Sequence, residues 1–341
     1  MLQTIGRALA LATATLAGVV STAQAQDKIV WDIAIYGPQR EVTVPIETMA
    51  KYIDEKSGGK FTFKLHYSES ISPAKSVLDS LKIEAIHGGL VAFGYTPGKV
   101  PLHLALDLPL LPIKTLDDWR RVQEAYYAWE PVKKELAKWN GIALYAALLP
   151  AYEFMGTGDP PLTLDNWKGM RVRALGPSGE AMKKLGAVPT SVPAPEVYTG
   201  LERGTFTAVA FPFSYSFGAY KLYQVSKWYT TGSQLGTINN SWVFSKSAYE
   251  KLPAEYKKLL TDVGPSQYAA GIAAYKAADE KYVPLFEKAG LKNIVFTPEM
   301  QKTFAEKAGK PVWDSWVKDN SAKGLPAQEA LDLILKAAKG G

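Results

Sequence analysis

Two arginines near the middle of this 341-residue chain are the clearest candidates for binding chemistry. Arg171 and Arg173 alternate along a predicted strand, so their side chains should point to opposite faces of the sheet. One of them can then face a cleft while the other is solvated. Arginine is suited to holding a carboxylate, because its planar guanidinium donates two parallel charge-assisted hydrogen bonds and stays ionised at any relevant pH. We therefore predict that Arg173 binds a ligand.

Aromatic residues are concentrated in the stretch 206–229. Most of them are expected to pack in the core, because a buried ring contributes a large apolar area. The segment 211–215 differs, since it follows a predicted strand, and loops beyond strand ends in open α/β sheets are where ligands usually bind. We expect some of its rings to line a pocket, with Phe211, Phe213 and Tyr215 as the candidates.

The residue types behind most enzymatic chemistry are scarce. Cysteine is absent, which excludes disulfides, thiolate nucleophiles and cysteine-ligated metal sites. The three histidines show no metal-ligand spacing, and His103 with Asp107 is expected to satisfy local backbone groups. The Gly-Thr-Gly segment 156–158 lacks the third glycine of a dinucleotide fingerprint, and no Gly-x-Ser-x-Gly elbow or Walker lysine motif occurs. We expect a binding protein without a cofactor or metal, and not an enzyme.

Residues 1–25 read as a secretory signal peptide. Arg7 precedes an apolar run from Ala8 to Val20, and Ala-Gln-Ala at 23–25 supplies a cleavage site. A transmembrane anchor is the alternative, but this run is shorter and less apolar than a spanning helix needs. Without a cysteine there is no lipid attachment site, so we expect a free periplasmic protein. The 39 Lys and Arg exceed the 33 Asp and Glu only slightly and are spread along the chain, so nucleic acid is not an expected partner.

The remaining chain reads as strands alternating with helices. The β-rich run 29–35 is followed by apolar residues at helical spacing from Ile46 to Ile53, and then by period-two alternation from Phe61 to Tyr67. Strand, helix and strand in this order predict a parallel crossover, and therefore an α/β domain in the first half. After a proline-containing link at 156–161, a second strand–helix series predicts a second α/β domain. A single helix is predicted from about Asp117 to Trp139, with a possible bend at Pro131.

Several collinear motifs resemble those of one protein family. The segment Trp167–Arg173 is similar to an Asp-Leu-x-Gly-x-x-x-Arg motif, and Leu-Gly-Ala at 185–187 precedes Glu-Val-Tyr at 196–198 with the expected spacing. Asp-Leu-Pro-Leu-Leu at 107–111 also matches. Together they resemble the solute receptors of TRAP (tripartite ATP-independent periplasmic) transporters, the DctP family, over essentially the whole chain after the signal peptide.

The resemblance implies a two-lobed periplasmic-binding-protein fold of the α/β class, with crossing hinge strands and a long helix spanning both lobes. Lobe I would comprise 26–150 and 239–278, and lobe II 151–238 and 279–341. It also implies that Arg173 pairs with the carboxylate of a small organic acid, which the receptor delivers to membrane permease subunits. We expect a monomer. A receptor of the same fold serving a sensor kinase or chemoreceptor is an alternative function, as is an exported enzyme using Glu153 as its acid or base.

The chain departs from the family pattern at positions expected to touch the ligand. Phe211 stands where many relatives carry an amide, and Tyr-Glu-Phe at 152–154 stands where many carry a second arginine. One cation surrounded by Phe211, Phe213, Tyr215 and Trp242 predicts a monocarboxylate with an apolar or aromatic body, with a dicarboxylate as the alternative. Glu153 would either accept a hydrogen bond from the ligand or lie solvated at a lobe edge. Asn239 or Asn240 would line the cleft or form a turn.

Overall fold

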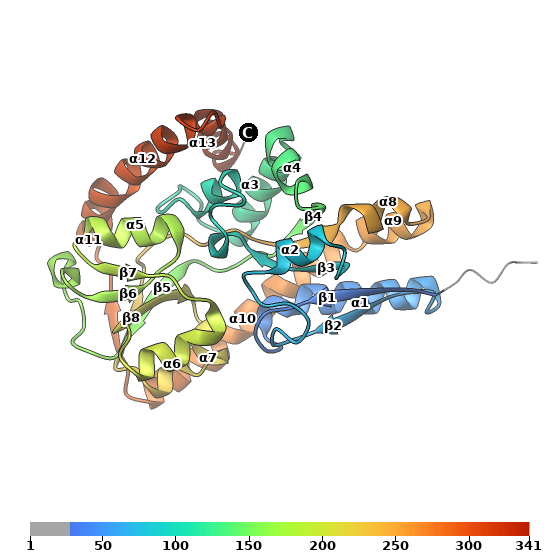
Figure 1. The fold of residues 1–341 in the computed structure, drawn as a ribbon. Coiled ribbons are helices and arrows are strands. Elements are labelled where there is room, and N and C mark those ends of the chain that lie inside the picture. Colours follow the sequence, from blue (N-terminus) through green and yellow to red (C-terminus); the bar gives the residue numbers. More distant parts are fainter. Residues whose placement is uncertain (1–27, 341) are drawn as a thin grey trace, which may run out of the picture.

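The computed structural model describes residues 28–340, and the predicted signal peptide at 1–25 lies outside them. The described chain is a mixed α/β structure built on two sheets (Figure 1). We call the part built on the five-stranded sheet the first lobe and the part built on the six-stranded sheet the second lobe. Within the described residues, no helix is both long enough and apolar enough to cross a membrane.

The first sheet has the strand order β2-β1-β3-β10-β4. Its strands are β1 (Ile29–Ala34), β2 (Phe61–His66), β3 (Gly88–Ala92), β4 (Gly141–Ala146) and β10 (Asn240–Ser245). Strand β1 is parallel to β2 and β3, as the predicted crossover requires, whereas β10 lies antiparallel between β3 and β4. The crossover helix is α1 (Val44–Ser57), which begins with Pro45 in its first turn and ends at Gly58, whose φ of 62° is left-handed.

The second sheet has the order β11-β9-β5-β8-β6-β7. Its strands are β5 (Tyr152–Gly156), β6 (Arg171–Arg173), β7 (Val188–Thr190), β8 (Ala208–Pro212), β9 (Trp228–Thr231) and β11 (Lys292–Val295). Strand β6 runs parallel to β7 and β8, and β5 is antiparallel to β8 and β9. Residues of β5 and β8 are buried throughout, because helices cover both faces of this part of the sheet.

Two extended connections join the lobes. Residues 147–151 lead from β4 to β5, and residues 232–239 lead from β9 back to β10. They lie side by side, since the amide of Ala147 donates to the carbonyl of Asn240 over 3.0 Å and the amide of Tyr152 donates to the carbonyl of Gly236 over 2.6 Å. These paired segments are the crossing strands of a two-lobed fold.

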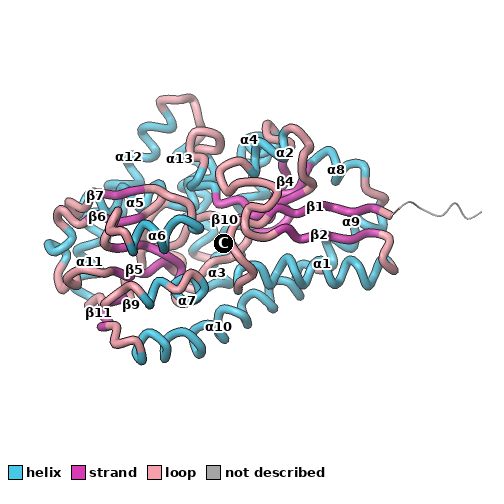
Figure 2. The backbone as a smooth tube through the Cα atoms, turned by 60° about the horizontal axis from the view of Figure 1, so that its bottom comes forward, coloured by secondary structure: helices cyan, strands magenta, loops and turns pink. Residues whose placement is uncertain are grey.

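The helix α10 (Gly264–Lys288) spans both lobes. It packs against α1 in the first lobe and against α7 (Tyr215–Ala219) in the second, and Figure 2 shows it running beneath both. Its predecessor α9 (Ala254–Asp262) ends just before Gly264, the first residue of α10, which Pro265 follows. Pro284 lies inside α10 and does not end it.

The C-terminal segment returns from the second lobe to the first. It contains α11 (Pro298–Phe304), α12 (Lys310–Ser321) and α13 (Ala327–Ala338). Helix α13 packs on α3 (Leu116–Ala128) of the first lobe, and Figure 1 shows α12 and α13 arching over to it. The predicted division at 279–341 places this whole segment in lobe II, and that division stays a prediction.

The single helix predicted over 117–139 is wrong. The structure has α3 and then α4 (Glu130–Ala137), separated at Trp129, whose φ and ψ of −72° and 129° are extended. Pro131 explains the break, because proline lacks the amide that would continue α3 but is well tolerated in the first turn of α4. The remaining helices are α2 (Val77–Lys82), α5 (Gly176–Lys184), α6 (Val197–Glu202) and α8 (Lys246–Lys251).

Candidate functional site

A cavity lies between the two lobes, beside the crossing segments. Its empty volume of about 280 Å³ includes space open to solvent, although almost all of its lining side chains are buried. Tyr36, Tyr95 and Asn240 line it from the first lobe, and the second lobe contributes side chains from β5, β6, β8 and α7. Because both lobes line this cavity, a molecule bound here would contact both of them, and separation of the lobes would widen its entrance.

Arg173 lies in this cavity and is 1% exposed. Its Nε and Nη2 donate to the carbonyl of Val192 over 3.1 and 2.9 Å, and its Nη1 donates to the carbonyl of Ala210 over 3.1 Å. Its guanidinium carbon lies 4.7 Å from the ring centre of Phe211. These contacts fix the orientation of the group and use three of its five N–H bonds. They leave its charge uncompensated, because Arg173 forms no ion pair with any described acidic residue.

The two arginines of β6 separate as their alternation predicts. Arg171 is exposed and Arg173 is buried, although they are only two residues apart. Strand β6 places Arg173 beside Val209 of β8, on the side of the sheet that faces the cavity. Arg171 is therefore a natural control for any experiment on Arg173.

A second guanidinium, that of Arg40, lines the same cavity from the first lobe. Arg40 is 7% exposed and precedes α1, and its guanidinium carbon lies 5.2 Å from the ring centre of Tyr36 and 5.6 Å from that of Tyr220. The sequence predicts a single cation at the site, because no arginine occupies the family's usual second position. That prediction is wrong: the second cation comes from a different segment of the chain and from the other lobe.

The other ionisable side chains of the cavity are tyrosines. Burial raises the pKa of Tyr36, Tyr95 and Tyr152, and it raises the pKa of Tyr220 to about 12. These phenols therefore stay neutral near pH 7. No Asp or Glu is among the described residues that line the cavity. The two guanidinium groups are the charges of the site, and its electrostatic character is strongly positive.

Two polar atoms in the cavity wall have no partner. The hydroxyl of Tyr220 and Oδ1 of Asn240 are buried and make no hydrogen bond among the described residues. The other end of the Asn240 amide is fixed, since Nδ2 donates to the hydroxyl of Tyr36 over 2.9 Å. Unpaired buried polar atoms are costly, so these atoms are suited to a ligand that supplies the missing donor and acceptor.

Of the residues predicted to bind ligand, Arg173, Phe211 and Tyr215 line the cavity, and the other four do not. Phe213 packs instead between Tyr229 and Phe286, at ring-centre distances of 6.1 and 6.5 Å, because it follows β8 and faces α10. Trp242 is fully buried in the middle of β10, paired with Leu90 and Tyr145 of the neighbouring strands. Trp242 is therefore a core residue, and Phe213 is a partly buried residue that packs against the core.

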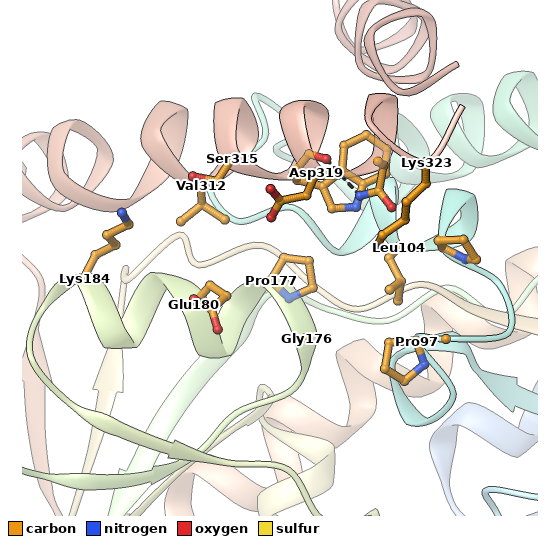
Figure 3. Close-up of a pocket in the computed structure, with 14 residues that line it drawn as sticks. Pro97, Leu104, Gly176, Pro177, Glu180, Lys184, Val312, Ser315, Asp319 and Lys323 are labelled. Carbon is orange, nitrogen blue, oxygen red and sulfur yellow. Dashed lines mark hydrogen bonds between the residues drawn. The ribbon is translucent and has the colours of Figure 1, made fainter. Parts of the chain in front are cut away.

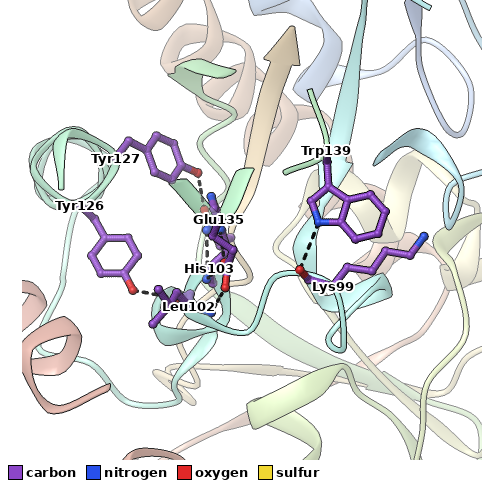
Figure 4. A network of polar contacts seen from close by, with 8 residues as sticks. Lys99, Leu102, His103, Tyr126, Tyr127, Glu135 and Trp139 are labelled. Carbon is purple, nitrogen blue, oxygen red and sulfur yellow. Dashed lines mark hydrogen bonds and ion pairs between the residues drawn. The ribbon is translucent and has the colours of Figure 1, made fainter. Parts of the chain in front are cut away.

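Asn239 is part of a buried polar network in the first lobe. Its Oδ1 accepts from Gln123 and Tyr127, its Nδ2 donates to the carbonyl of His103, and its amide donates to Asp107. Figure 4 shows the neighbouring part of this network, in which Nδ1 of His103 lies 2.7 Å from Oε2 of Glu135. Asn239 therefore holds the end of a crossing segment in place, and Asn240, the next residue, faces the cavity.

The two roles expected for Glu153 were a hydrogen bond to the ligand and a solvated position at a lobe edge. In the structure Glu153 neither lines the cavity nor is solvated. It is 6% exposed on β5, and its carboxylate accepts from the Thr230 hydroxyl over 2.6 Å and from the Ser233 amide over 2.9 Å. Burial raises its pKa to about 7, although these hydrogen bonds oppose the rise. It joins β5 to the start of the crossing segment 232–239.

The titration of Glu153 predicts a pH-dependent stability. Because its pKa is about 7 in the folded protein against 4.5 ordinarily, the folded state keeps a proton that the unfolded state loses. The free energy of unfolding should therefore decline as pH rises from about 4.5 to 7. Burial raises the pKa of Asp107 to about 8, which adds a decline of the same sign. In Glu153→Gln the decline should be smaller, as measured by urea unfolding at several pH values.

The exposed Glu55 of α1 offers the control, since Glu55→Gln should leave the pH profile unchanged. Identical profiles for Glu153→Gln and the unmodified protein would contradict the assignment. Ligand affinity should change less than about twofold in Glu153→Gln, because this side chain does not reach the cavity.

A larger pocket of about 1110 Å³ lies between α5 and α12 (Figure 3). Its charged side chains are of both signs, with Glu180 and Asp319 near Lys184 and Lys323. None of the predicted ligand-binding residues lines it. Elsewhere, no cluster of three or more His, Asp or Glu side chains that could hold a metal ion occurs in residues 28–340.

The comparison with known proteins agrees with this geometry. The family model of bacterial extracellular solute-binding protein, family 7 (DctP), matches residues 38–319. A solute-binding protein of Albidiferax ferrireducens is 27% identical over 298 residues, or 84% of either chain, and a monocarboxylate 2-oxoacid-binding periplasmic protein of Nostoc is 23% identical over 90% of either chain. A TRAP solute-binding protein from Rhodoferax ferrireducens, crystallised with copurified benzoate, superimposes with a TM-score of 0.83 at 18% identity, covering 92% of this chain and 98% of that one.

The family match covers both crossing segments, the long helix and every strand except β1, so it spans both lobes and all of the cavity lining except Tyr36. It confirms the resemblance drawn from the sequence motifs and the two-lobed fold that it implied. The members of this family bind solutes and do not transform them. The chain therefore belongs to the DctP family, family 7 of the bacterial extracellular solute-binding proteins, and is a binding protein rather than an enzyme.

Proposed function

We propose that the protein is the periplasmic receptor of a TRAP transporter and that it binds a small organic acid through Arg173. One observation carries the proposal: a buried guanidinium, fixed by backbone carbonyls and without an acidic partner among the described residues, faces the cavity between the lobes. Placing a charge there is unfavourable unless an opposite charge joins it. A ligand carboxylate supplies that charge.

Lobe closure explains how such a pair becomes strong enough for capture. The Coulomb energy of an ion pair rises as water leaves and the effective dielectric falls, so an arginine in a closed cavity binds a carboxylate more tightly than one on an open surface. The lobes already contact each other across the cavity, where the amide of Ala194 donates to the Tyr95 hydroxyl over 2.9 Å. A bound ligand would add its own contacts with both lobes to those that the lobes already make with each other.

The names of similar proteins support an acid as the ligand. The Nostoc relative is named for monocarboxylate 2-oxoacids, and the Rhodoferax structure holds benzoate. The cavity is small, because buried side chains from both lobes occupy most of the space between them, so it suits a small acid. The aromatic walls, including Phe211 and Tyr215, suit a carbon skeleton with an apolar face.

Delivery to membrane permease subunits is the second half of the proposal. It rests on membership of the DctP family and on the predicted signal peptide at 1–25, which would place the protein in the periplasm. The receptor would act as a monomer that presents its closed form to the permease.

Native mass spectrometry of the protein as purified tests the proposal directly, because a closed receptor retains tightly bound ligand. We expect a mass excess that disappears on denaturation and that belongs to an unmodified organic acid. Titration calorimetry with that acid should then give a single site. A purified protein that carries no small molecule and binds no carboxylate in a broad screen would contradict the proposal.

A further inference from the structure

The carboxyl group of Asp107 is buried where the two lobes meet, and Asp107 is not among the residues that line the ligand cavity. It is the last residue of the 3-10 helix Leu102–Asp107 in the first lobe and is 0% exposed. A Cβ added to Gly94, in the same lobe, would lie 3.0 Å from Oδ2 of Asp107. A Cβ added to Gly176, the first residue of α5 in the second lobe, would lie 3.8 Å from the same oxygen. Residues of both lobes therefore cover this carboxyl group.

The two oxygens of the Asp107 carboxyl group differ in their contacts. Oδ1 accepts from the amide of Asn239 over 2.6 Å, which ties Asp107 to the end of the crossing segment 232–239. Oδ2 is buried and makes no hydrogen bond among the described residues. The positive N-terminal end of α5 would favour the charged form, but no amide of α5 donates to Oδ2. A carboxylate at this point is only half satisfied, and keeping it charged is therefore costly.

No opposite charge compensates Asp107 within residues 28–340, since it belongs to none of their ion pairs. Burial raises the pKa of Tyr127 on α3, which keeps that phenol neutral, and His103 lies against Glu135 of α4. Tyr95, in the neighbouring 3-10 turn, lines the ligand cavity instead. The other charged side chains of α4, α5 and α13, which pack against the same 3-10 helix, are exposed. The crossing segment 232–239 contains no charged residue.

The environment of Asp107 depends on whether the lobes are together. Burial raises its pKa to about 8, and only the hydrogen bond from the Asn239 amide opposes the rise, so the group holds its proton near pH 7. Separation of the lobes would carry Gly176 away with the second lobe and admit water to Oδ2. A hydrated aspartate titrates near its ordinary pKa of 3.8, so it is ionised near pH 7.

We propose that closure of the lobes takes up one proton at Asp107, so that the receptor holds its ligand more tightly as the pH falls. The proposal rests on the proposed function, because it treats the closed form as the one that holds the ligand. Above about pH 4 the open form has lost this proton, whereas the closed form keeps it up to about pH 8. Proton and ligand both favour the closed form, so each should strengthen the binding of the other. Affinity should decline as the pH rises through this range.

Lobe closure can be measured without any ligand. Because the chain has no cysteine, Ser70→Cys in the first lobe and Gln224→Cys in the second, both at exposed positions, can be labelled selectively for single-molecule fluorescence energy transfer. As the pH falls from about 7.5 to about 5.5, the population with the shorter distance should grow at least about fivefold. In Asp107→Asn, whose neutral amide resembles the protonated carboxyl group, that population should not vary with pH. A population that ignores pH in the unmodified protein, or that varies equally in Asp107→Asn, would overturn the proposal.

Titration calorimetry measures the proton directly. Benzoate and pyruvate serve as probes, each at about pH 7 in two buffers of different ionisation enthalpy. Binding should take up close to one proton in the unmodified protein and none in Asp107→Asn. Glu153→Gln is the matched control, because Glu153 is also a buried carboxyl group with a raised pKa, but its partners Thr230 and Ser233 do not belong to the first lobe. The control should keep the proton uptake, and its loss in Glu153→Gln but not in Asp107→Asn would assign the proton to the wrong residue.

Failure of the proposed function would look different. If neither benzoate nor pyruvate binds, yet the closed population of the ligand-free protein follows pH and depends on Asp107, the proton linkage stands and the organic-acid ligand is what the result counts against. Binding of either acid without proton uptake, in a protein whose closed population ignores pH, is the opposite outcome. It would leave an organic-acid receptor and overturn the role of Asp107.

Discussion

Replacing Arg173 by alanine is expected to weaken binding of the cognate acid by about 2 to 5 kcal/mol, the usual loss when one partner of a buried charge pair is removed. At about 1.4 kcal/mol per tenfold change, this corresponds to roughly 30-fold to several thousandfold in Kd. The loss is large because the ligand carboxylate would be buried among the cavity side chains without its counter-charge. Titration calorimetry with the acid found in the purified protein measures it.

The same change also frees the carbonyls of Val192 and Ala210, so some loss of stability is expected and must be separated from the loss of binding. Arg173→Lys helps here, since it keeps a cation yet should still bind more weakly because a point charge cannot make two parallel hydrogen bonds. Arg171→Ala is the matched control, because this arginine is on the exposed face of the same strand. Equal losses in Arg171→Ala and Arg173→Ala would show that the effect does not come from the cavity.

The variant Gly37→Ala is expected to weaken ligand binding by roughly 10- to 100-fold while the protein still folds. Gly37 has a φ of 74° in the loop after β1, and a Cβ there would overlap the hydroxyl of Tyr220 and lie 2.9 Å from Nη1 of Arg40. Overpacking of this kind costs about 1 to 3 kcal/mol. Because Tyr220 belongs to the second lobe, the cost falls on the closed form, which is the form that holds the ligand.

Gly58→Ala provides the comparison for this prediction. Gly58 has a φ of 62° and no heavy atom within 4 Å of the position of a Cβ, so alanine there meets the same backbone strain without the overlap. Both variants should lose a similar amount of unfolding free energy, about 1 to 2 kcal/mol from the left-handed backbone, and only Gly37→Ala should lose affinity. Small-angle scattering with saturating ligand should show that Gly37→Ala closes less completely. Unchanged affinity in Gly37→Ala would contradict the closeness of the two lobes at this point.

Local patterns were sufficient to predict the parts of the fold that depend on local interactions. Pro45 and Gly58 mark the two ends of α1, and the alternation on either side of it predicts the parallel pair β1 and β2. The burial of Arg173 opposite the exposed Arg171 was also predictable from strand alternation, whereas its role in binding stays a prediction. Strand β10 was not, since the asparagine pair at 239–240, where the strand begins, resembles a turn, and its place between β3 and β4 depends on distant pairing.

The second cation could not be found by position in the sequence. Arg40 is 133 residues before Arg173 and in the other lobe, so its presence in the cavity depends on how the lobes close. The same holds for Tyr36, Tyr95 and Tyr220, which come from three separate segments. Phe213 was wrongly expected to line the cavity because it is only two residues after Phe211. It packs against α10 instead, because β8 ends between these two residues.

The position of β10 in the first sheet has a consequence for how the chain reaches its native state. Strands β3 and β4 are not neighbours until β10 is inserted between them, and β10 is made only after nearly all of the second sheet. An N-terminal fragment ending at residue 150 would therefore carry two unpaired strand edges in place of a finished sheet, and would be prone to aggregation. We therefore expect that neither lobe folds independently, and that folding is slow and cooperative because it depends on contacts between distant residues.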